Sequence, residues 1–400
     1  MNESLLLIGY CVAGCLCGIL TGLIPGIHVN TLLPFLLLFP DSGIHGAVLI
    51  FSLALCHTYV DFIPSTLLGV PDADTVLSIL PGHRLLLAGR GYEAVKLTVI
   101  GSFGAFICSC IAFFPLSLML SNLYWIISPL IPFIILFFIG YSIVSERTGR
   151  KIGYAIFVSF LAGIYGHITL SGSFLPDDII LFPIFGGLYG LSTLMLSVKT
   201  CGTIPSQRLD GTLQVNRASL LCSVIKGGIA GICVAVFPGI GPSHGATVVS
   251  SRSSPRHFLL SVSGVNTANV IFGLAVLYML GKSRSGAILA IQDLIHCDPH
   301  MIKLLLSSSC IVSGIAVIST LVLAQVVIRM ITRIKYRYIT LISSSIIIFT
   351  VGILTGITGL LILGIGCIIG LLPVLLGIRR IHCMSVLLFP ILIYYFNIVV

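Results

Sequence analysis

The sequence carries very little charge for its length. Of its 400 residues, only 8% are Asp, Glu, Lys or Arg, while 57% are apolar and the mean hydropathy is +1.16. A soluble domain needs a broad polar shell to face water, and this composition cannot supply one, so a soluble globular fold is excluded. The net charge of +9 fits the basic cytoplasmic loops of a membrane protein and requires no nucleic acid partner.

The sequence also lacks the common signatures of enzymes and metal proteins. It contains no phosphate-binding loop, no HExxH motif and no nucleophile elbow, which argues against ATP-driven pumping by this chain alone. Its 13 cysteines form no CxxC pair, and most of them lie inside apolar runs. We interpret them as small packing residues rather than as metal ligands or redox groups. No cofactor is expected.

Long apolar runs dominate the sequence instead. Each is about the 20 residues that a helix needs to cross roughly 30 Å of hydrocarbon. The strands of a transmembrane barrel would alternate apolar and polar residues over about 10 positions, and no such alternation occurs. The sequence predicts an all-α, polytopic integral membrane protein with about 10–14 membrane segments, including helix breaks and re-entrant hairpins. The clearest runs are Leu5–Leu23, Thr98–Leu120, Leu123–Ile143, Leu341–Thr358 and Leu360–Ile378.

The two halves of the chain resemble each other. The Pro25-Gly26 pair recurs as Pro238-Gly239, 213 positions later (238 − 25), and Lys96 corresponds to Lys303, 207 positions later (303 − 96). A long repeat in a membrane chain indicates duplication, the common plan of secondary carriers. The predicted parts are a first transmembrane repeat at 1–198, a cytoplasmic linker at 199–217 and a second transmembrane repeat at 218–400.

The positions of basic residues predict how the repeats are oriented. Arg and Lys gather near 147–151, 199–217, 329–337 and 379–380, and such loops face the cytoplasm. Loops that correspond under the repeat differ in charge, so they are expected on opposite sides of the membrane. The repeats are therefore predicted to have inverted topology, in a multi-pass protein of the plasma membrane with both termini outside.

Both Pro-Gly pairs interrupt what would otherwise be spanning helices. A break frees backbone amides and carbonyls at membrane depth, where only protein or water can satisfy them. Polar side chains flank each break, as a binding site near the midplane requires. The alternative is a kinked packing helix with incidental polar neighbours, and the recurrence in both halves favours the site. The candidate substrate-binding residues here are Pro25, Gly26, His28, Asn30, Pro238, Gly239, Ser243 and His244.

A second polar segment in each half predicts a re-entrant hairpin. These segments cover 57–75 and 264–286, too polar for lipid and too apolar for a free loop. Further candidate substrate-binding residues are Thr58, Ser65, Thr66, Asn266, Thr267 and Asn269. The candidates for ion coupling are Asp61, Asp72 and Asp74. With hydroxyl and carbonyl oxygens these carboxylates suit a sodium ion, a hard cation. For Asp72 and Asp74, helix capping is an equal alternative, whereas Asp61 follows an apolar run, where ionisable residues are usually functional.

Several motifs, taken in order, resemble a known family. They are Pro25-Gly26-Ile-His28, Ser65-Thr-Leu-Leu-Gly-Val-Pro71, Pro81-Gly82-His-Arg84, Gly187-Leu-Tyr-Gly-Leu-Ser192 and Phe237-Pro238-Gly239-Ile-Gly241-Pro242. In these the chain resembles the large permease subunit of the tripartite tricarboxylate transporters, especially a shorter, divergent branch without obvious partners. The resemblance implies a carboxylate permease with inverted repeats, coupled to sodium or protons. It also implies a small membrane subunit and an extracytoplasmic solute-binding protein as partners.

These patterns lead to one main hypothesis and two alternatives. The main hypothesis is a secondary active transporter (a symporter) that moves a small organic anion, a di- or tricarboxylate, and works in the lipid bilayer as a monomer or homo-oligomer. The first alternative is a carrier or flippase for a lipid-linked phosphate. An intramembrane enzyme is the second, but His57 and Asp61 are the only close pair and no nucleophile lies beside them in the sequence. We therefore expect no enzyme.

Overall fold

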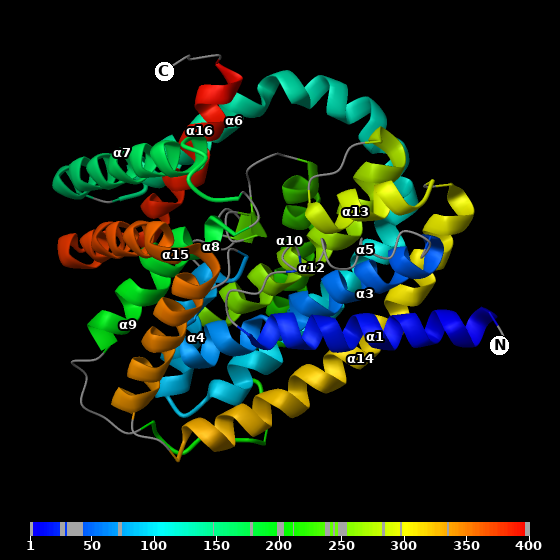
Figure 1. The fold of residues 1–400 in the computed structure, drawn as a ribbon, viewed down its shortest axis with the longest axis horizontal. Coiled ribbons are helices and arrows are strands. Elements are labelled where there is room, and N and C mark those ends of the chain that lie inside the picture. The colour runs from blue at the N-terminus through cyan, green and yellow to red at the C-terminus, as the bar shows by residue number, and fades with distance from the viewer. Residues whose placement is uncertain are drawn as a thin grey trace.

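The structure is a computed structural model of the whole chain (Figure 1). It describes residues 3–24, 29, 43–70, 74–146, 148–176, 179–197, 204–210, 212–236, 241–242, 245–246, 254–281, 285–296, 298–333 and 336–396. All regular elements in these residues are helices. The α-helices are α1 (Glu3–Leu23), α3 (Gly43–Val60), α4 (Ile79–Leu87), α5 (Gly91–Ile127), α6 (Ile131–Val144), α7 (Gly149–Ser171), α8 (Leu181–Phe185), α9 (Ser192–Ser197), α10 (Arg217–Val236), α12 (Pro255–Leu280), α13 (Gly286–Leu294), α14 (Pro299–Ile331), α15 (Tyr336–Leu376) and α16 (Ser385–Tyr395). The short 3₁₀ and π helices are η2 (Pro64–Leu68), η3 (Val76–Ser78), η4 (Ser128–Leu130), η5 (Gly186–Leu191) and η6 (Arg380–Met384).

The predicted polytopic membrane fold is confirmed by the lengths and composition of these helices. Within the described residues, eight helical segments are long and apolar enough to cross a bilayer. Three shorter apolar helices accompany them, at Ile131–Val144, Leu181–Leu196 and Arg380–Tyr395. The eight long segments are Glu3–Leu23, Gly43–Leu68, Gly91–Met119, Gly149–Ser171, Arg217–Val236, Pro255–Leu280, Pro299–Ile331 and Thr340–Leu376.

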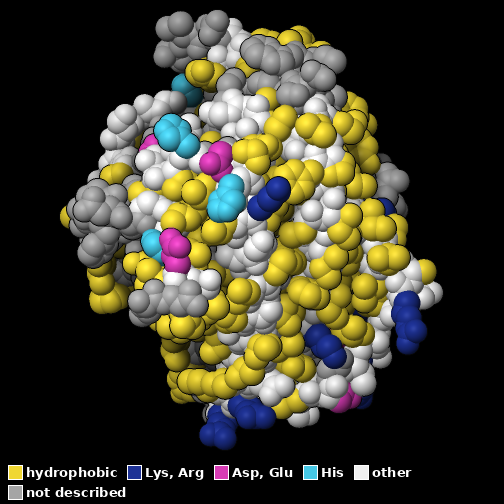
Figure 2. All heavy atoms as spheres, turned by 90° about the vertical axis from the view of Figure 1, so that its right-hand side faces the viewer, with side chains coloured by type: hydrophobic (Ala, Val, Ile, Leu, Met, Phe, Trp, Pro, Cys, Tyr) yellow, Lys and Arg dark blue, Asp and Glu magenta, His cyan; other side chains and the backbone are white. Residues whose placement is uncertain are grey.

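The outer helices present apolar side chains to the surroundings. Along α1 the exposed side chains follow one another at intervals of three or four residues, which places them on one face of the helix. Figure 2 shows hydrophobic side chains over the right and lower parts of one face of the molecule, with scattered Lys and Arg, while Asp, Glu and His side chains gather at its upper left. A surface of this kind suits lipid rather than water. The exposed large apolar residues of α1 are Leu5, Ile8, Val12, Leu16 and Leu20.

The opposite face of α1 packs closely on α3 through glycine. A Cβ added at Gly14 would lie 2.6 Å from the Cβ of Ser52, and one added at Gly18 would lie 2.8 Å from the Cβ of Cys56. Both distances are too short for real carbon atoms, so only glycine permits this contact. Because the later glycine meets the later residue of α3, the two helices run in the same direction.

Two helices form the centre of the molecule. The spanning windows of α3 and α12 are 94% and 89% buried, against 33% for α1. They run in opposite directions, since the start of α12 packs beside α4, the helix that follows α3, and its Leu259 and Leu260 share a core cluster with Leu85. α12 also packs against α10 and α5, while α3 packs against α1 and α14.

A second group of helices has cores of its own. α7, α8, α9, α15 and α16 pack together and lie on the left in Figure 1. The contacts are again close, since a Cβ at Gly187 would lie 2.9 Å from the amide nitrogen of Cys367. α15 is interrupted at Gly356, whose φ of 62° and ψ of −154° suit glycine and no other residue. The spanning segment is therefore two helices joined at this glycine.

The segment before α10 is docked on the protein. The side-chain amide of Gln207 donates to the carbonyl of Leu86 at 2.9 Å and accepts from the backbone amide of Gly91 at 2.7 Å. The amide of Arg208 also donates to the carbonyl of Gly89 at 3.0 Å. The stretch predicted as a linker thus lies against the turn between α4 and α5.

One predicted hairpin differs from the observed structure. The sequence places Asn266, Thr267 and Asn269 on a re-entrant hairpin, whereas they lie within α12, which continues unbroken to Leu280. Polar residues are costly in a helix that faces lipid, but α12 is covered by neighbouring helices that supply hydrogen-bond partners. The prediction was wrong here because it assumed contact with lipid.

Candidate functional site

The helix α3 and the residues that continue it carry an unusual number of buried polar side chains. All of them are at most 4% exposed. In the interior of a membrane protein such groups need partners from other helices or a ligand, because no water competes for them. They are Ser52, His57, Thr58, Asp61, Ser65 and Thr66.

Asp61 and Thr58 meet polar residues of α12. The side-chain nitrogen Nδ2 of Asn266 donates to Oδ2 of Asp61 at 3.1 Å, and the hydroxyls of Thr58 and Thr267 lie 3.1 Å apart. All four residues are at most 3% exposed. We call Thr58, Asp61, Asn266 and Thr267 the α3–α12 polar cluster. The structure thus brings together four residues that the sequence proposed for the site, two from each half of the chain.

The cluster lies near the middle of both spanning segments. Asp61 lies within Gly43–Leu68, and Asn266 within Pro255–Leu280. Asp61 is about six positions from the centre of its segment and Asn266 about two, or roughly 8 Å and 2 Å at 1.5 Å per residue, so both lie well inside the hydrocarbon thickness. A carboxylate at this depth is costly unless a cation, a proton or hydrogen bonds stabilise it.

A widened turn of helix follows Asp61. Pro64 begins the π helix η2, which ends at Gly69 with a φ of 73°. The hydroxyl of Ser65 donates to the carbonyl of Asp61 at 3.0 Å, and the hydroxyl of Thr66 donates to the carbonyl of Phe62. Single π turns are frequent at functional sites. Here the turn gathers carbonyl and hydroxyl oxygens, the ligands that hard cations prefer, next to a carboxylate.

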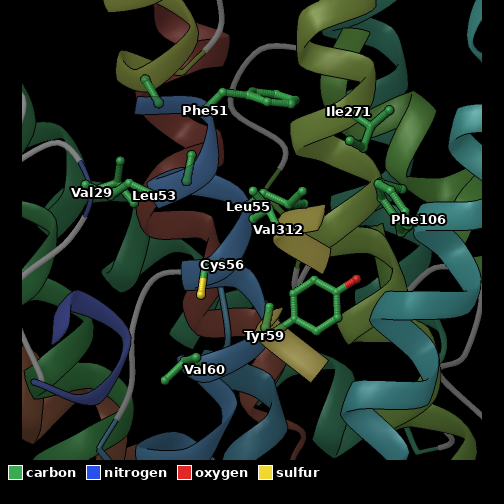
Figure 3. Packing of buried hydrophobic residues seen from close by; sticks show 14 of the residues in the cluster. Val29, Phe51, Leu53, Leu55, Cys56, Tyr59, Val60, Phe106, Ile271 and Val312 are labelled. Atoms are coloured by element: carbon green, nitrogen blue, oxygen red, sulfur yellow. The ribbon is translucent and has the colours of Figure 1, made fainter. Parts of the chain in front are cut away.

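Other helices enclose the cluster. The ring nitrogen Nδ1 of His57 lies 3.0 Å from the hydroxyl of Thr21 on α1, and the hydroxyl of Tyr59 lies 2.5 Å from that of Ser313 on α14. Figure 3 shows the apolar side chains packed around Cys56 and Tyr59. This shell keeps the dielectric constant low around Asp61, so its carboxylate interacts strongly with any nearby charge.

Two of the remaining predicted site residues are described, and the others lie outside the described residues. Asn269 is half-buried on α12, and Asp74 is partly buried in the turn before η3. α1 ends at Leu23 and α10 at Val236, in each case two residues before the Pro-Gly pair. The calls that fall outside the described residues are Pro25, Gly26, His28, Asn30, Asp72, Pro238, Gly239, Ser243 and His244.

The partners of His57 and Asp61 bear on the enzyme hypothesis. The ring of His57 hydrogen-bonds to α1, while the carboxylate of Asp61 hydrogen-bonds to α12. The hydroxyl of Thr21 also donates to the carbonyl of Gly18 at 3.2 Å, within its own helix. In the described part of the chain, no group of three His, Cys, Asp or Glu side chains is arranged to hold a metal ion.

The sequence did not predict that one arginine is buried. Arg379 and Arg380 read as a basic cytoplasmic pair, yet Arg380 is only 7% exposed and its carbonyl accepts a hydrogen bond from the Tyr189 hydroxyl at 3.2 Å. The one signal in the sequence is that this pair stands between two isoleucines, Ile378 and Ile381. Tyr189 belongs to a motif that supported the family resemblance, but nothing in the sequence connects it to Arg380.

The neighbouring Arg379 has an ordinary structural role. Its Nε donates to Oε1 of Glu146 at 3.1 Å, and Nε2 of His382 lies 3.1 Å from the same oxygen. Burial alone would raise the pKa of Glu146. Hydrogen bonds from the Arg379 backbone, from His382 and from the Arg379 side chain lower this pKa by more, so it lies below its ordinary value. This cluster fastens the end of α6 to the start of η6.

Comparisons with known proteins give a consistent result. Residues 8–385 match the model of the tripartite tricarboxylate transporter TctA family. A protein from Methanocaldococcus jannaschii, described only as uncharacterized, is 32% identical over 413 residues, covering 98% of this chain and 99% of that protein. No solved structure matches the chain.

Proposed function

The chain belongs to the tripartite tricarboxylate transporter TctA family, and we propose from this premise that it is a secondary active transporter for a di- or tricarboxylate. Family membership makes it a multi-pass membrane transport protein. The coupling ion in the proposal is sodium or a proton, and Asp61 is the residue that binds it.

The observation that carries the proposal is the contact between Asp61 and Asn266. A carboxylate inside a membrane protein is retained at a cost, and such residues usually serve ion or substrate pathways. Here it is held at 3.1 Å by an amide from an antiparallel helix of the other half of the chain. Movement of the two helices relative to each other would change the environment of the carboxylate, which is how a bound ion is coupled to a conformational change.

We propose in addition that 1–198 and 218–400 are inverted repeats. Elements of the two halves recur at similar intervals: α3 and α12 begin 212 positions apart (255 − 43), and α4 and α13 begin 207 apart (286 − 79). The packing is also reciprocal, since α5 packs on α10 and α12, and α14 packs on α1 and α3. Opposite directions of α3 and α12 support the inversion.

The arrangement of basic residues supports a sidedness for this proposal. Gln325 near the end of α14 donates to the hydroxyl of Tyr92 at 3.0 Å, so the end of α14 lies beside the start of α5. The docked segment around Gln207 lies at the same end of α5. We assign this end, with Arg329 and Arg333 on and after α14, to the cytoplasm, and both chain termini to the outside of the plasma membrane.

Family membership also supports two kinds of partner. A small membrane subunit and an extracytoplasmic solute-binding protein complete a tripartite system. We propose that the apolar outer faces of helices such as α1 contact the bilayer, the small subunit or a second copy of the chain.

A thermal-shift screen of the purified protein in detergent tests the proposed function. Di- and tricarboxylates are compared with polyprenyl phosphates, each with and without sodium. A ligand that binds the folded state raises the melting temperature, because it stabilises that state by RT ln(1 + [L]/Kd). Stabilisation by a carboxylate supports the proposal, and an added effect of sodium identifies the ion. Stabilisation by a polyprenyl phosphate alone would replace the carboxylate transporter with a lipid carrier.

A further inference from the structure

A buried arginine that pairs with no carboxylate among the described residues lies in the second group of helices. Arg380 begins η6 and is 7% exposed. Arg90, Arg256, Arg379 and His382 form ion pairs with Glu93 or Glu146, whereas Arg380 forms none with a described residue. A buried charge is strongly unfavourable without a counter-charge or a full set of hydrogen bonds, so a missing anion is the first explanation to consider.

Only one nitrogen of the guanidinium of Arg380 is occupied by described residues. Nη1 donates to the carbonyl of Tyr189 and the hydroxyl of Ser192, both at 3.3 Å, and to the hydroxyl of Thr193. Nε is buried and has no hydrogen-bond partner among the residues that the structure describes. Nε and Nη2 form the edge of the guanidinium that holds a carboxylate through two parallel hydrogen bonds. No described residue occupies this edge.

Arg380 lines a small pocket between the two groups of helices. Leu77, Ile79 and Leu80 form one wall, and Tyr189 and Thr193 stand with Arg380 on the other. The cavity is small, about 20 Å³, which is room for little more than one water-sized group and far below the roughly 300–1,000 Å³ of pockets for whole drug-sized ligands. The pocket therefore suits one anionic group of a small molecule. Its apolar wall strengthens the attraction between that group and the guanidinium.

A short polar chain connects this pocket with the α3–α12 polar cluster. Ser78 stands between two residues of the pocket wall, and its hydroxyl lies 3.4 Å from that of Ser65. Ser65 in turn donates to the carbonyl of Asp61 at 3.0 Å. These two hydrogen bonds tie the segment that carries the pocket wall to the backbone of Asp61, so the pocket lies next to the element that carries the candidate ion site.

We infer that Arg380 is the anion-binding residue of this protein and that its Nε–Nη2 edge binds a carboxylate group of the transported molecule in this pocket. The identity of the anion rests on the proposed function, whereas the existence of an anion site rests on the burial and hydrogen bonding of Arg380. Ser192 and Thr193 are positioning residues, because they hold Nη1 and so orient the free edge.

Two adjacent arginines provide a matched test. Arg380→Met removes a buried charge that has no counter-charge, and Ser192 and Thr193 keep their hydrogen bonds to the carbonyls of Leu188 and Tyr189. Arg379→Met removes the partner of Glu146 and leaves that carboxylate with less compensation. Without ligand, we expect Arg380→Met to melt at the wild-type temperature or above, and Arg379→Met to melt below it.

The decisive readout is binding of radiolabelled citrate, succinate and inorganic phosphate to purified wild type, Arg380→Met, Arg380→Lys and Arg379→Met. We expect Arg380→Met to bind the carboxylate about tenfold or more weakly than wild type, and Arg380→Lys to restore part of the affinity. The Kd of Arg379→Met should stay within about twofold of the wild-type value. Wild-type carboxylate binding by Arg380→Met would overturn the inference and leave the proposed function intact. Binding of phosphate alone, lost in Arg380→Met, would support the anion site and overturn the carboxylate substrate. If wild type binds none of the three anions, both proposals fail.

Discussion

Asn266 donates a hydrogen bond from Nδ2 to the carboxylate of Asp61 at 3.1 Å, and the two residues are 205 positions apart in the chain. The bond joins the two most buried spanning helices, which run in opposite directions. A carboxylate so placed gains from protonation or from a bound cation, and the hydrogen bond from the neutral amide of Asn266 does not itself neutralise its negative charge. This relationship underlies the first prediction.

Asp61→Asn is expected to abolish the stabilisation by sodium while the protein still expresses and folds. An amide has nearly the same shape as the carboxylate but cannot bind a cation by charge or exchange a proton in the physiological range. The measurement is the melting temperature of the purified variant at increasing sodium concentration. Asp210→Asn, at an exposed position before α10, serves as the control and should respond like wild type. A sodium response in Asp61→Asn equal to that of wild type would remove Asp61 from the ion site.

The hydroxyl pair of Thr58 and Thr267 is expected to couple α3 and α12 energetically. Thr58→Val and Thr267→Val preserve shape and remove the 3.1 Å contact, so a double-mutant cycle isolates its energy. Contacts of this kind in membrane proteins average about 0.6 kcal/mol. Thr169 donates only to carbonyls of its own helix, so Thr169→Val combined with Thr267→Val should give no coupling. Zero coupling in the Thr58–Thr267 cycle would contradict the contact.

The close packing of α1 on α3 predicts a strong effect of substitution at Gly18. A side chain there would meet the Cβ of Cys56 at 2.8 Å, so Gly18→Val is expected to destabilise the protein by about 1–3 kcal/mol through overpacking. Gly9→Val is the matched control, because it lies on the same helix with nothing within 4 Å of the added Cβ. Thermal unfolding in detergent compares the two. Equal melting temperatures would show that α1 does not pack on α3 in this way.

Glu146 is expected to make stability depend on pH in the acid range. Because its pKa is lower in the folded protein than in the unfolded chain, the unfolded chain binds the proton more tightly. The stabilisation is therefore present above the ordinary glutamate pKa of about 4.3 and is lost as the pH falls through the lower folded-state pKa.

Glu146→Gln tests this dependence. At neutral pH we expect the free energy of unfolding to fall by about 1–2 kcal/mol, because the hydrogen bonds to charged Arg379 weaken. The loss is no larger because Arg379 remains partly in contact with solvent. Between about pH 5 and 3 the melting temperature of wild type should fall more steeply than that of the variant. Glu3→Gln, at an exposed position, should leave both the stability at neutral pH and the pH dependence of the melting temperature unchanged. Parallel pH profiles for wild type and Glu146→Gln would contradict the assignment.

The sequence was sufficient to predict the membrane class and to identify the residues of the α3–α12 polar cluster, but not their contacts. Composition and apolar runs predict spanning helices because the thickness of the bilayer leaves few alternatives. Asp61 and Asn266 were each recognisable as polar residues in apolar surroundings. Their pairing was not predictable, since it depends on how two distant helices pack.

Two features required the structure for a clear physical reason. The continuity of α12 depends on its burial among other helices, and a local sequence window does not contain those neighbours. Arg379 and Arg380 are adjacent and chemically identical, yet one pairs with Glu146 and the other lines a pocket whose described lining residues include no carboxylate. Only the direction of each side chain at the start of η6 separates them.

The most direct measurement is uptake of radiolabelled citrate and succinate into proteoliposomes that contain the purified protein, driven by an imposed sodium or proton gradient. Wild type should accumulate one of the two above the equilibrium level only when the gradient is present, and Asp61→Asn should show no gradient-driven accumulation. Accumulation by Asp61→Asn at the wild-type rate, or no carboxylate uptake by wild type under either gradient, would contradict a carboxylate transporter coupled through Asp61.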